Sequence, residues 1–343
     1  MILSDNAKVM GPDGLTNVSS LKKGDLVLDY LGKSNRILNI QRYSEGQLNR
    51  ITTSKGRVIS CKNVNSILLS GDSCELKLGV DIYSYHNRTD VDITFDVEHY
   101  LLGWLIGDGY FGKFPAVREL YFMANPDEVD YLEDKLVEAG YEINLSFDDK
   151  GCGFYYLYGN DAEQIINKGL VYNNERSKSL DWTLFNRNQI LNILRGVFDS
   201  DGSVRLKSTH NGRSKCVDIT HSSKSFQSEF DIQLALSCLG IKSRISTRHR
   251  IDKRGFEFDT TDLQVYASSS RLIAQNLELF SLDRKRELLH SKSEKGNSEN
   301  KKSTESLSLE FIKEIEPEFV REYSEIEVEG NCLIANGLCL TNN

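Results

Sequence analysis

The 343-residue sequence predicts an α+β fold in which a tandem αββαββα repeat is inserted into an all-β domain built from both ends of the chain. Residues 1–95 contain short apolar runs separated by Gly and Asn turns, and residues 317–343 have the same texture. Between them, residues 96–290 carry helical periodicity, and one order of helices and strands occurs twice. A tract rich in Lys, Ser, Glu and Asn leads to the assignment of residues 291–316 as a polar linker.

The repeat divides the central region into half-domains at 96–187 and 188–290. In the first half, helices are expected at 99–107, 126–139 and 161–170, and strands at 110–113, 119–123, 142–147 and 154–158. In the second half, helices are expected at 188–200, 225–239 and 269–277, and strands at 204–208, 216–220, 243–247 and 263–266. A repeat of about 90 residues is too long for a solenoid unit and indicates a tandem pseudo-dimer, so we expect a monomer.

Charge is distributed unevenly along the chain. The net charge of −8 disfavours a nucleic-acid partner, yet residues 203–254 hold eleven Lys and Arg against four Asp and Glu, an excess of seven. Alternation within the predicted strands favours one cationic sheet face that binds phosphates and guanine edges, and a solvated sheet face is the alternative. The candidate DNA-binding residues are Arg205, Lys207, Arg213, Lys215, Lys242, Arg244, Arg248 and Arg250. The first half is poor in cations, so there we expect polar and aromatic residues such as Tyr121, Tyr156 and Tyr158 to contact DNA.

Nothing in the sequence indicates a membrane or a secreted protein. No apolar run approaches the roughly 18 residues that a membrane span needs, and the start has no basic region followed by an apolar stretch. The seven cysteines are odd in number and form no CxxC pair, which favours reduced thiols over a disulfide framework or a zinc site. We therefore expect a cytoplasmic protein.

Two apolar helices end in the same dipeptide. Residues 101–109 read LLGWLIGDG and residues 194–202 read LRGVFDSDG, with small residues at matching places. Such spacing lets two helix backbones approach closely, which would bring Asp108 and Asp201 together. Two converging carboxylates repel unless a cation lies between them, and Mg²⁺ is the expected ion. The alternative is that each Asp-Gly merely ends a core helix, but the duplication disfavours it.

These motifs resemble the LAGLIDADG homing endonucleases, and the resemblance covers residues from about 97 to 290. It implies that the paired helices form the interface of a pseudo-dimer and that the strands form saddles over the DNA major groove. It also implies that Asp108 and Asp201 bind two or three shared Mg²⁺ ions, with Gly107 and Ser200 beside them in the metal site.

Members of that family carry a lysine near the active site late in each repeat. The candidates here are Lys178 and Lys285, and either could instead be an ordinary surface residue. The chain departs from the family motif at Ile106 in the first copy and at Arg195 in the second, and neither position is that of a metal ligand.

Both ends of the chain resemble the Hint fold of inteins. The resemblance rests on Pro12-Asp13-Gly14, on the segment LKKGDLVL at 21–28, and on EVEGN at 327–331 followed by ANGL at 335–338. An endonuclease inserted into a Hint domain is the arrangement of large inteins.

The residues that splicing needs are missing from the matching positions. Ile2 stands where a thiol or hydroxyl nucleophile belongs, and Asn65 stands where a histidine belongs. Thr341, Asn342 and Asn343 supply no penultimate histidine. The resemblance therefore implies a degenerate Hint shell that does not splice.

The sequence thus predicts a Mg²⁺-dependent endonuclease that cuts both strands of DNA at a long recognition site. Two alternatives stay open. One is an autoprocessing intein with variant chemistry that uses Cys332 or Cys339, and the other is an RNA-binding intron maturase with an idle metal site.

Overall fold

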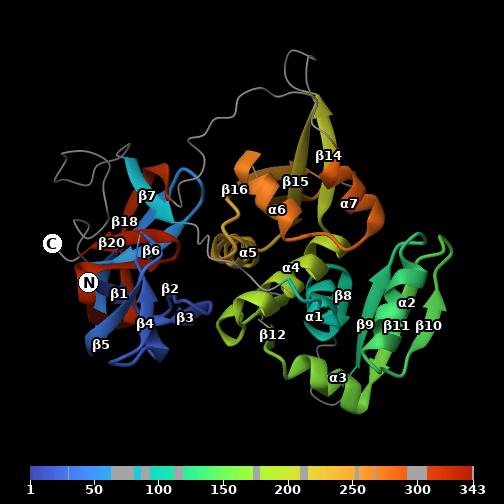
Figure 1. Cartoon of the computed structure of the whole chain (residues 1–343), viewed down its shortest axis with the longest axis horizontal. Coiled ribbons are helices and arrows are strands. Elements are labelled where there is room, and N and C mark those ends of the chain that lie inside the picture. Colours follow the sequence, from blue (N-terminus) through green and yellow to red (C-terminus); the bar gives the residue numbers. More distant parts are fainter. Residues whose placement is uncertain are drawn as a thin grey trace.

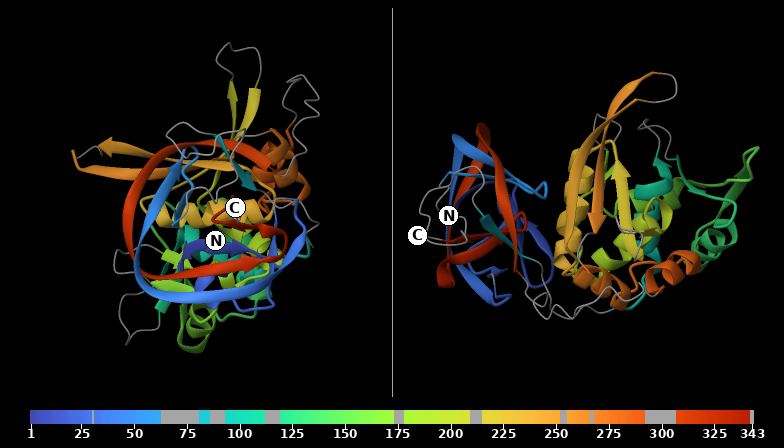
Figure 2. Two further views of the ribbon diagram at one scale, coloured as in Figure 1. Left: turned by 90° about the vertical axis from the view of Figure 1, so that its left-hand side faces the viewer. Right: turned by 90° about the horizontal axis from the view of Figure 1, so that it is seen from above.

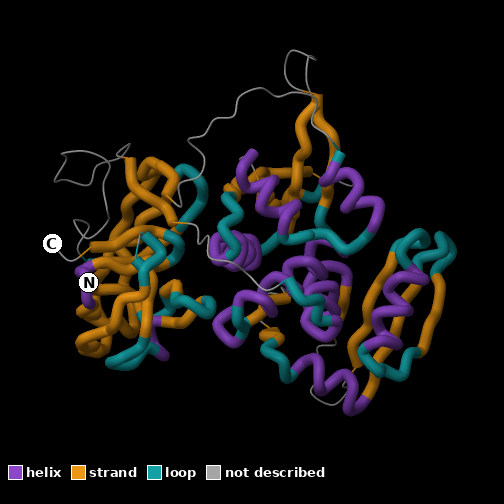
Figure 3. Tube along the Cα trace, viewed as in Figure 1, coloured by secondary structure: helices purple, strands orange, loops and turns teal. Residues whose placement is uncertain are grey.

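The computed structural model describes residues 1–29, 31–62, 81–85, 93–111, 119–172, 178–208, 215–251, 255–265, 268–291 and 307–341. Figure 1 shows two bodies: a terminal β unit, formed by the described residues before 86 and after 306, and a central unit, formed by those from 93 to 291. Both marked chain ends lie in the terminal β unit, and a tube coloured by element shows that the helices gather in the central unit (Figure 3).

The terminal β unit is built on a ten-stranded sheet of order β3-β2-β19-β20-β7-β18-β1-β6-β5-β4. Its strands are β1 (Ile2–Ser4), β2 (Lys8–Met10), β3 (Leu15–Asn17), β4 (Leu26–Leu28), β5 (Ser34–Thr53), β6 (Val58–Cys61), β7 (Asp81–Tyr85), β18 (Leu307–Val328), β19 (Cys332–Ala335) and β20 (Leu338–Thr341). The long strands β5 and β18 pair antiparallel from Ile312 opposite Thr53 to Val328 opposite Ile37. Strands from the two ends of the chain therefore share one sheet and one hydrophobic core.

One boundary prediction is wrong. Strand β18 begins at Leu307, so residues 307–316 are strand and do not belong to a linker reaching 316. The apolar residues Leu307, Leu309 and Phe311 alternate with polar ones, which is the strand signal that the charged composition of this segment obscured. Residues 292–306 lie outside the described residues.

The central unit contains the predicted order αββαββα twice. The first copy comprises α1 (Val97–Asp108), β8 (Gly109–Phe111), β9 (Glu119–Ala124), α2 (Val129–Glu138), β10 (Asn144–Phe147), β11 (Gly153–Tyr158) and α3 (Gly159–Ile166). The second comprises α4 (Arg187–Ser200), β14 (Ser203–Ser208), β15 (Lys215–Ser223), α5 (Phe226–Cys238), β16 (Ser243–Ile251), β17 (Glu257–Val265) and α6 (Ser268–Asn276). Their sheets, β8-β9-β11-β10 and β14-β15-β17-β16, have the same strand order, so the copies match in topology as well as in sequence pattern.

Several short elements were not predicted. The helix expected at 161–170 ends at Ile166, because Gly169 turns the chain with a positive φ of 107°. Strand β12 (Leu170–Tyr172) then pairs with β13 (Lys178–Leu180), and helix α7 (Asp283–His290) follows the second copy. Three 3₁₀ turns complete the described elements: η1 (Val18–Ser20), η3 (Trp182–Leu184) and η5 (Glu329–Asn331).

Helices α1 and α4 form the centre of the molecule. Side chains of Asp96 and Asn186 cap their N-termini, the latter in a reciprocal capping box with Gln189. The two helices cross closely because glycine occupies both contact points. A methyl group on Gly103 would lie 1.9 Å from the Ile193 carbonyl oxygen.

The terminal β unit packs against the second copy, mainly against α5. The Arg57 guanidinium is fully buried and donates to Glu310 at 3.0 Å and to Ser237 of α5 at 2.9 Å. Lys8 forms an ion pair with Asp231 on the same helix. A view from above shows the two units side by side, with the second copy nearer the terminal β unit (Figure 2).

None of the helices in the described part of the chain combines the length and apolar character that a membrane span requires. None of the five cysteines whose side chains are described (Cys61, Cys152, Cys238, Cys332 and Cys339) takes part in a disulfide bond.

Candidate metal centre and nucleic-acid faces

Asp108 and Asp201 end the two central helices. Asp108 is the last residue of α1, and Asp201 is the C-cap of α4. A methyl group on Gly107 would lie 1.9 Å from the Ser200 hydroxyl oxygen and 3.2 Å from the Asp201 Cβ, so the two helix ends touch at this point. The close approach predicted from the small residues therefore brings the two Asp-Gly pairs to one place.

The carboxylates of Asp108 and Asp201 repel each other electrostatically. Burial raises the pKa of Asp108 to about 6, and the charge of Asp201 adds to the increase. Asp201 is more open, since its side chain is 48% exposed. A cation between these groups would stabilise both ionised carboxylates, which is the requirement for a divalent metal site with oxygen ligands.

The two predicted lysines occupy equivalent positions at these helix ends. The Lys178 Nζ donates to the carbonyl oxygen of Gly107 and, at 2.8 Å, to that of Gly109. The buried Lys285 Nζ donates at 2.8 Å to the carbonyl oxygen of Gly202, the counterpart of Gly109, and also to carbonyls in the last turn of α4. Each lysine thus neutralises the negative end of one helix dipole beside one Asp.

Both lysines lose their protons more easily than a free lysine does. Burial lowers the pKa of Lys178 to about 8, although the carboxylates of Asp108 and Asp201 oppose that shift. Burial also lowers the pKa of Lys285. An ammonium of lowered pKa beside carboxylates suits proton transfer and charge stabilisation.

The possible ligand set is small. The described part of the chain contains no group of three or more His, Cys, Asp or Glu side chains that could hold a metal ion. A metal shared by Asp108 and Asp201 would need backbone oxygens or water as further ligands. Gly107 and Ser200 directly precede the two Asp residues, and although the carbonyl of each accepts a lysine hydrogen bond, a carbonyl oxygen has a second lone pair.

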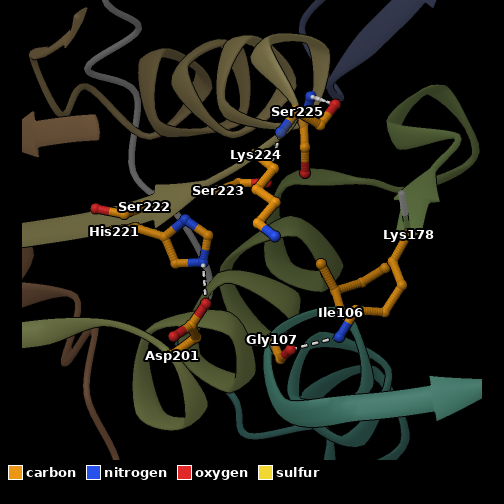
Figure 4. Close-up of a pocket in the computed structure, with 10 residues that line it drawn as sticks. Ile106, Gly107, Lys178, Asp201, His221, Ser222, Ser223, Lys224 and Ser225 are labelled. Carbon is orange, nitrogen blue, oxygen red and sulfur yellow. Dashed lines mark hydrogen bonds and ion pairs between the residues drawn. The ribbon is translucent and has the colours of Figure 1, made fainter. Parts of the chain in front are cut away.

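An open pocket of about 480 Å³ adjoins this centre (Figure 4). Its wall includes Gly107, Lys178 and Asp201, together with the end of β15 and the turn that leads to α5. His221 projects from β15 toward Asp201, with 3.7 Å between its Nε2 and the Asp201 Oδ2. His221 was not predicted from the sequence, although an ionisable residue among the buried positions of a strand is a signal that could have found it.

The buried carboxylate of Glu229 fixes the orientation of the His221 imidazole. The Nδ1 of His221 lies 2.7 Å from Glu229 Oε1, and both side chains are almost fully buried. Burial disfavours the charged imidazole, yet the carboxylates of Glu229 and Asp201 outweigh it and raise the pKa of His221.

One face of the second sheet carries four of the eight predicted cations. Arg205, Arg244, Arg248 and Arg250 are exposed at positions of matching register on this face. Arg248 and Arg250 share Asp262, at 2.9 and 3.3 Å, and Arg244 donates to Gln264 at 2.7 Å. Helix α5 covers the opposite, apolar face. The sheet therefore presents a row of positioned guanidinium groups to solvent.

Some predicted DNA contacts fall elsewhere. Lys242 precedes β16 and is only 8% exposed, so its assignment to the cationic face is wrong. The backbone of Lys207 pairs with Cys216 and that of Lys215 with Ser208, but their side chains lie outside the described residues. Arg213 lies outside them altogether.

The sheet of the first copy carries aromatic rings instead. Tyr121 stacks on Tyr110 with 5.1 Å between ring centroids, and its ring also contacts Phe154 and Tyr156. Tyr156 stacks on the exposed Tyr158. The three tyrosines predicted to replace cations in this half therefore form one continuous aromatic face.

The positions matched to splicing residues lie in the terminal β unit. Ile2 begins β1, opposite Glu325 of β18, and Thr341 ends β20. Asn65, Asn342 and Asn343 lie outside the described residues.

Comparisons with known proteins address the central unit. Residues 188–293 match the family described as LAGLIDADG-like domain. A comparison with curated proteins found no match. Among solved structures, the homing endonuclease I-DmoI in complex with DNA and Ca is 14% identical, with a TM-score of 0.35, and the match covers 54% of this chain and 92% of that one.

Two other solved structures have different descriptions. The N-terminal LAGLIDADG domain of WhiA is 15% identical, covers 55% of this chain and 82% of that one, and has a TM-score of 0.36. The gp41-1 intein is 28% identical, but the match covers only 25% of this chain and 68% of that one, with a TM-score of 0.21. The family match spans α4 to α7, the elements that carry Asp201, Lys285 and the arginine face. The similarity of this chain to the LAGLIDADG-like domain family is therefore found over residues 188–293.

Proposed function

We propose that this protein is a site-specific DNA endonuclease that cuts both strands of its target with divalent metal ions. The observation that carries the proposal is the duplicated helix end, where two Asp-Gly pairs meet and each has a lysine that donates to its carbonyl oxygens. Two equivalent half-sites in one chain match the two strands of a duplex, so a monomer suffices. We further propose that the protein works in the cytoplasm.

Asp108 and Asp201 would hold Mg²⁺, with the Gly107 and Ser200 carbonyls as further ligands and two or three ions shared between the halves. Bound Mg²⁺ supplies activation of water and neutralisation of the leaving oxygen. Lys178 and Lys285 hold protons beside the scissile phosphate position, where they can steady the attacking water or the charge that develops on phosphate oxygens. The residues present fit this chemistry because burial and the charge of Asp201 disfavour the ionised Asp108 carboxylate, and a bound cation would offset both effects.

The two sheets would contact the duplex in different ways. The arginine face of the second sheet suits phosphates and guanine edges, because guanidinium groups bind both with two hydrogen bonds. The aromatic face of the first sheet suits the apolar edges of bases and sugars rather than phosphates. The acidic net charge of the whole chain is compatible with this division, since the cations are concentrated where DNA would lie.

A library of double-stranded DNA sites incubated with the protein and Mg²⁺ tests the proposal directly. We expect breaks in both strands at one family of long related sequences. Absence of cleavage throughout the library, together with tight binding of RNA, would favour the maturase alternative.

Substitution of both Arg244 and Arg248 by Ala should weaken binding to the target DNA. It should also lower the slope of log K against log salt concentration by up to about 2, because each lost phosphate contact releases about one counterion fewer. Fluorescence anisotropy at several salt concentrations measures the slope. The exposed pair Lys22 and Lys23 in the terminal β unit is a matched control, and its double Ala variant should keep the original slope. If the slope is unchanged in the arginine variant, the arginine face is exposed to solvent and does not contact the DNA.

We propose that the terminal β unit is a degenerate Hint shell, and that the chain does not splice when placed between two foreign domains. Splicing begins with an acyl shift onto a side-chain nucleophile, and Ile2 has none. Mass spectrometry after a day at neutral pH should find no ligated product. Ile2→Cys with Asn65→His should allow at most cleavage at the N-terminal junction by added thiol, because the C-terminal end still lacks its histidine. A ligated product from the unaltered sequence would overturn the proposal.

The autoprocessing alternative would use Cys332 or Cys339 as its nucleophile, and neither cysteine is suited to that role. Cys332 and Cys339 are both buried, and burial raises the pKa of Cys339 well above its usual value. A nucleophilic cysteine needs the opposite shift and access to its substrate.

A further inference from the structure

The second copy contains a charged pair where the first is apolar. Tyr110 and Ser203 each follow an Asp-Gly pair, and they pair with Tyr121 and Thr220, respectively. The next residues along those strands, Phe122 and His221, are therefore equivalent. Glu229 is the fourth residue after the α5 N-cap, and the corresponding residue of α2 is the fully buried Leu132. The fold thus accommodates Phe and Leu here, so packing alone does not require His and Glu.

Burial of this pair leaves part of it without a hydrogen-bond partner. Glu229 binds the Nδ1 of His221, while the buried Nε2 has no hydrogen bond within the described residues. A buried polar atom without a partner costs about 1–3 kcal/mol. The Nε2 points toward Asp201, on the wall of the pocket in Figure 4. The pair therefore directs Nε2, which has a free lone pair in the neutral ring, at a carboxylate.

We propose that His221 Nε2 and the Asp201 carboxylate form a mixed nitrogen and oxygen site for a transition-metal ion of the Mn²⁺, Co²⁺ or Zn²⁺ class. A histidine that binds metal usually donates its other ring N–H to a carboxylate, as His221 can to Glu229. Two ligands held at about 2.1 Å in tetrahedral geometry lie roughly 3.4 Å apart. The separation of 3.7 Å closes by a few tenths of an ångström when the half-exposed Asp201 adjusts.

The cations near this pocket have other partners. Lys178 donates to the carbonyls of Gly107 and Gly109, and Lys224 lies over the Phe258 ring, 5.2 Å from its centroid. Imidazole nitrogen favours transition metals, whereas Mg²⁺ prefers oxygen ligands alone. The inference adds a metal preference to the Asp201 side of the proposed nuclease centre, with which it shares that residue. It can be tested without DNA.

Binding of Co²⁺ to the purified full chain tests the inference. Calorimetric titration should give a higher affinity for Co²⁺ than for Mg²⁺, and visible absorption should report nitrogen ligation. The variant His221→Phe copies the residue of the first half and should weaken Co²⁺ binding by about 10- to 100-fold while Mg²⁺ binding changes little. Glu229→Gln should weaken Co²⁺ binding to a smaller degree, since it leaves the nitrogen in place.

His99 supplies a matched control. Its Nδ1 lies 2.7 Å from Asp96 at the opposite end of α1, so His99→Gln removes a similar carboxylate and histidine pair far from the pocket. Co²⁺ binding should be unchanged in this variant. If His221→Phe does not fold, NMR of the wild-type Co²⁺ complex decides the question, because a bound imidazole gives a strongly shifted exchangeable N–H resonance.

The inference and the proposed function fail separately. Equal Co²⁺ affinity and spectra in wild type and His221→Phe, or a Co²⁺ complex without the shifted resonance, would overturn the histidine ligand even if the protein cuts DNA with Mg²⁺. Co²⁺ binding that depends on His221, in a protein that cleaves no DNA, would support the metal site and reject the nuclease.

Discussion

Asp108→Asn and Asp201→Asn should each abolish double-strand cleavage and leave DNA binding largely intact. Each substitution removes a proposed metal ligand but keeps the size and shape of the side chain. Loss of several kcal/mol of charge stabilisation in the transition state corresponds to a rate decrease on the order of 10³-fold or more. The residues of the proposed DNA-binding faces lie on strands of the two sheets, whereas Asp108 and Asp201 lie at the ends of α1 and α4.

Cleavage of a supercoiled plasmid that carries the target, resolved on a gel, separates nicked from linear product. Fluorescence anisotropy in the presence of Ca²⁺ measures binding to the target DNA. Asp130→Asn makes the same chemical change at an exposed position of α2 and should cleave normally. If either Asp108→Asn or Asp201→Asn cuts both strands at the normal rate, the assignment of the metal centre is wrong.

Thermal unfolding distinguishes lost chemistry from lost structure. Burial and the charge of Asp201 both disfavour the ionised Asp108 carboxylate in the folded, metal-free protein. Asparagine removes that penalty, so Asp108→Asn should melt at the same or a higher temperature than wild type. A large decrease in Tm would instead indicate that the carboxylate supports the fold.

The central features of the candidate site could be predicted because they repeat in the sequence. A single Asp-Gly after an apolar helix does not predict a metal site, because many core helices end in this way. Two copies with matching small residues did predict the helix pair and its converging carboxylates. The lysines came from the family resemblance alone, because Lys178 reaches the site from β13 and Lys285 from α7, two short elements without strong periodicity. No local pattern connects either lysine with its carbonyl partners, which lie about 70 to 90 positions earlier in the sequence.

The errors and omissions have a common cause. Burial of a charged side chain depends on tertiary contacts, which strand alternation does not reveal. Lys242 was counted with Arg244 and Arg248, yet the strand begins only at Ser243 and the lysine is enclosed. His221 was overlooked because its partners, Glu229 and Asp201, come from two other elements. The start of β18 was predicted too late because pairing with a neighbouring strand stabilises its charged residues as strand. The composition of the segment does not reveal that pairing.

Substitution of Gly196 by Ala should destabilise the protein, although Ala is the better helix former by about 1 kcal/mol. The added methyl would lie 2.0 Å from the Tyr100 carbonyl oxygen and 2.5 Å from the Trp104 backbone nitrogen, both in the facing helix. These are backbone atoms, so relief requires the helices to separate along their whole contact. Overpacked cores lose about 1–3 kcal/mol, and occasionally more. The clash therefore outweighs the gain in helix propensity.

Differential scanning calorimetry should show a Tm lower by roughly 2–5 °C, because the shift per kcal/mol is about 2–4 °C for domains of 150–250 residues and smaller for a longer chain. Gly140→Ala is the control. Its methyl meets no atom within 4 Å, so only the left-handed backbone, with φ of 79°, opposes it. In the folded fraction of Gly196→Ala, cleavage should fall further than DNA binding, because separated helices also separate Asp108 from Asp201. A Tm equal to that of wild type would mean that α1 and α4 do not meet at this glycine, and the argument that close helix approach creates the metal centre would fail with it.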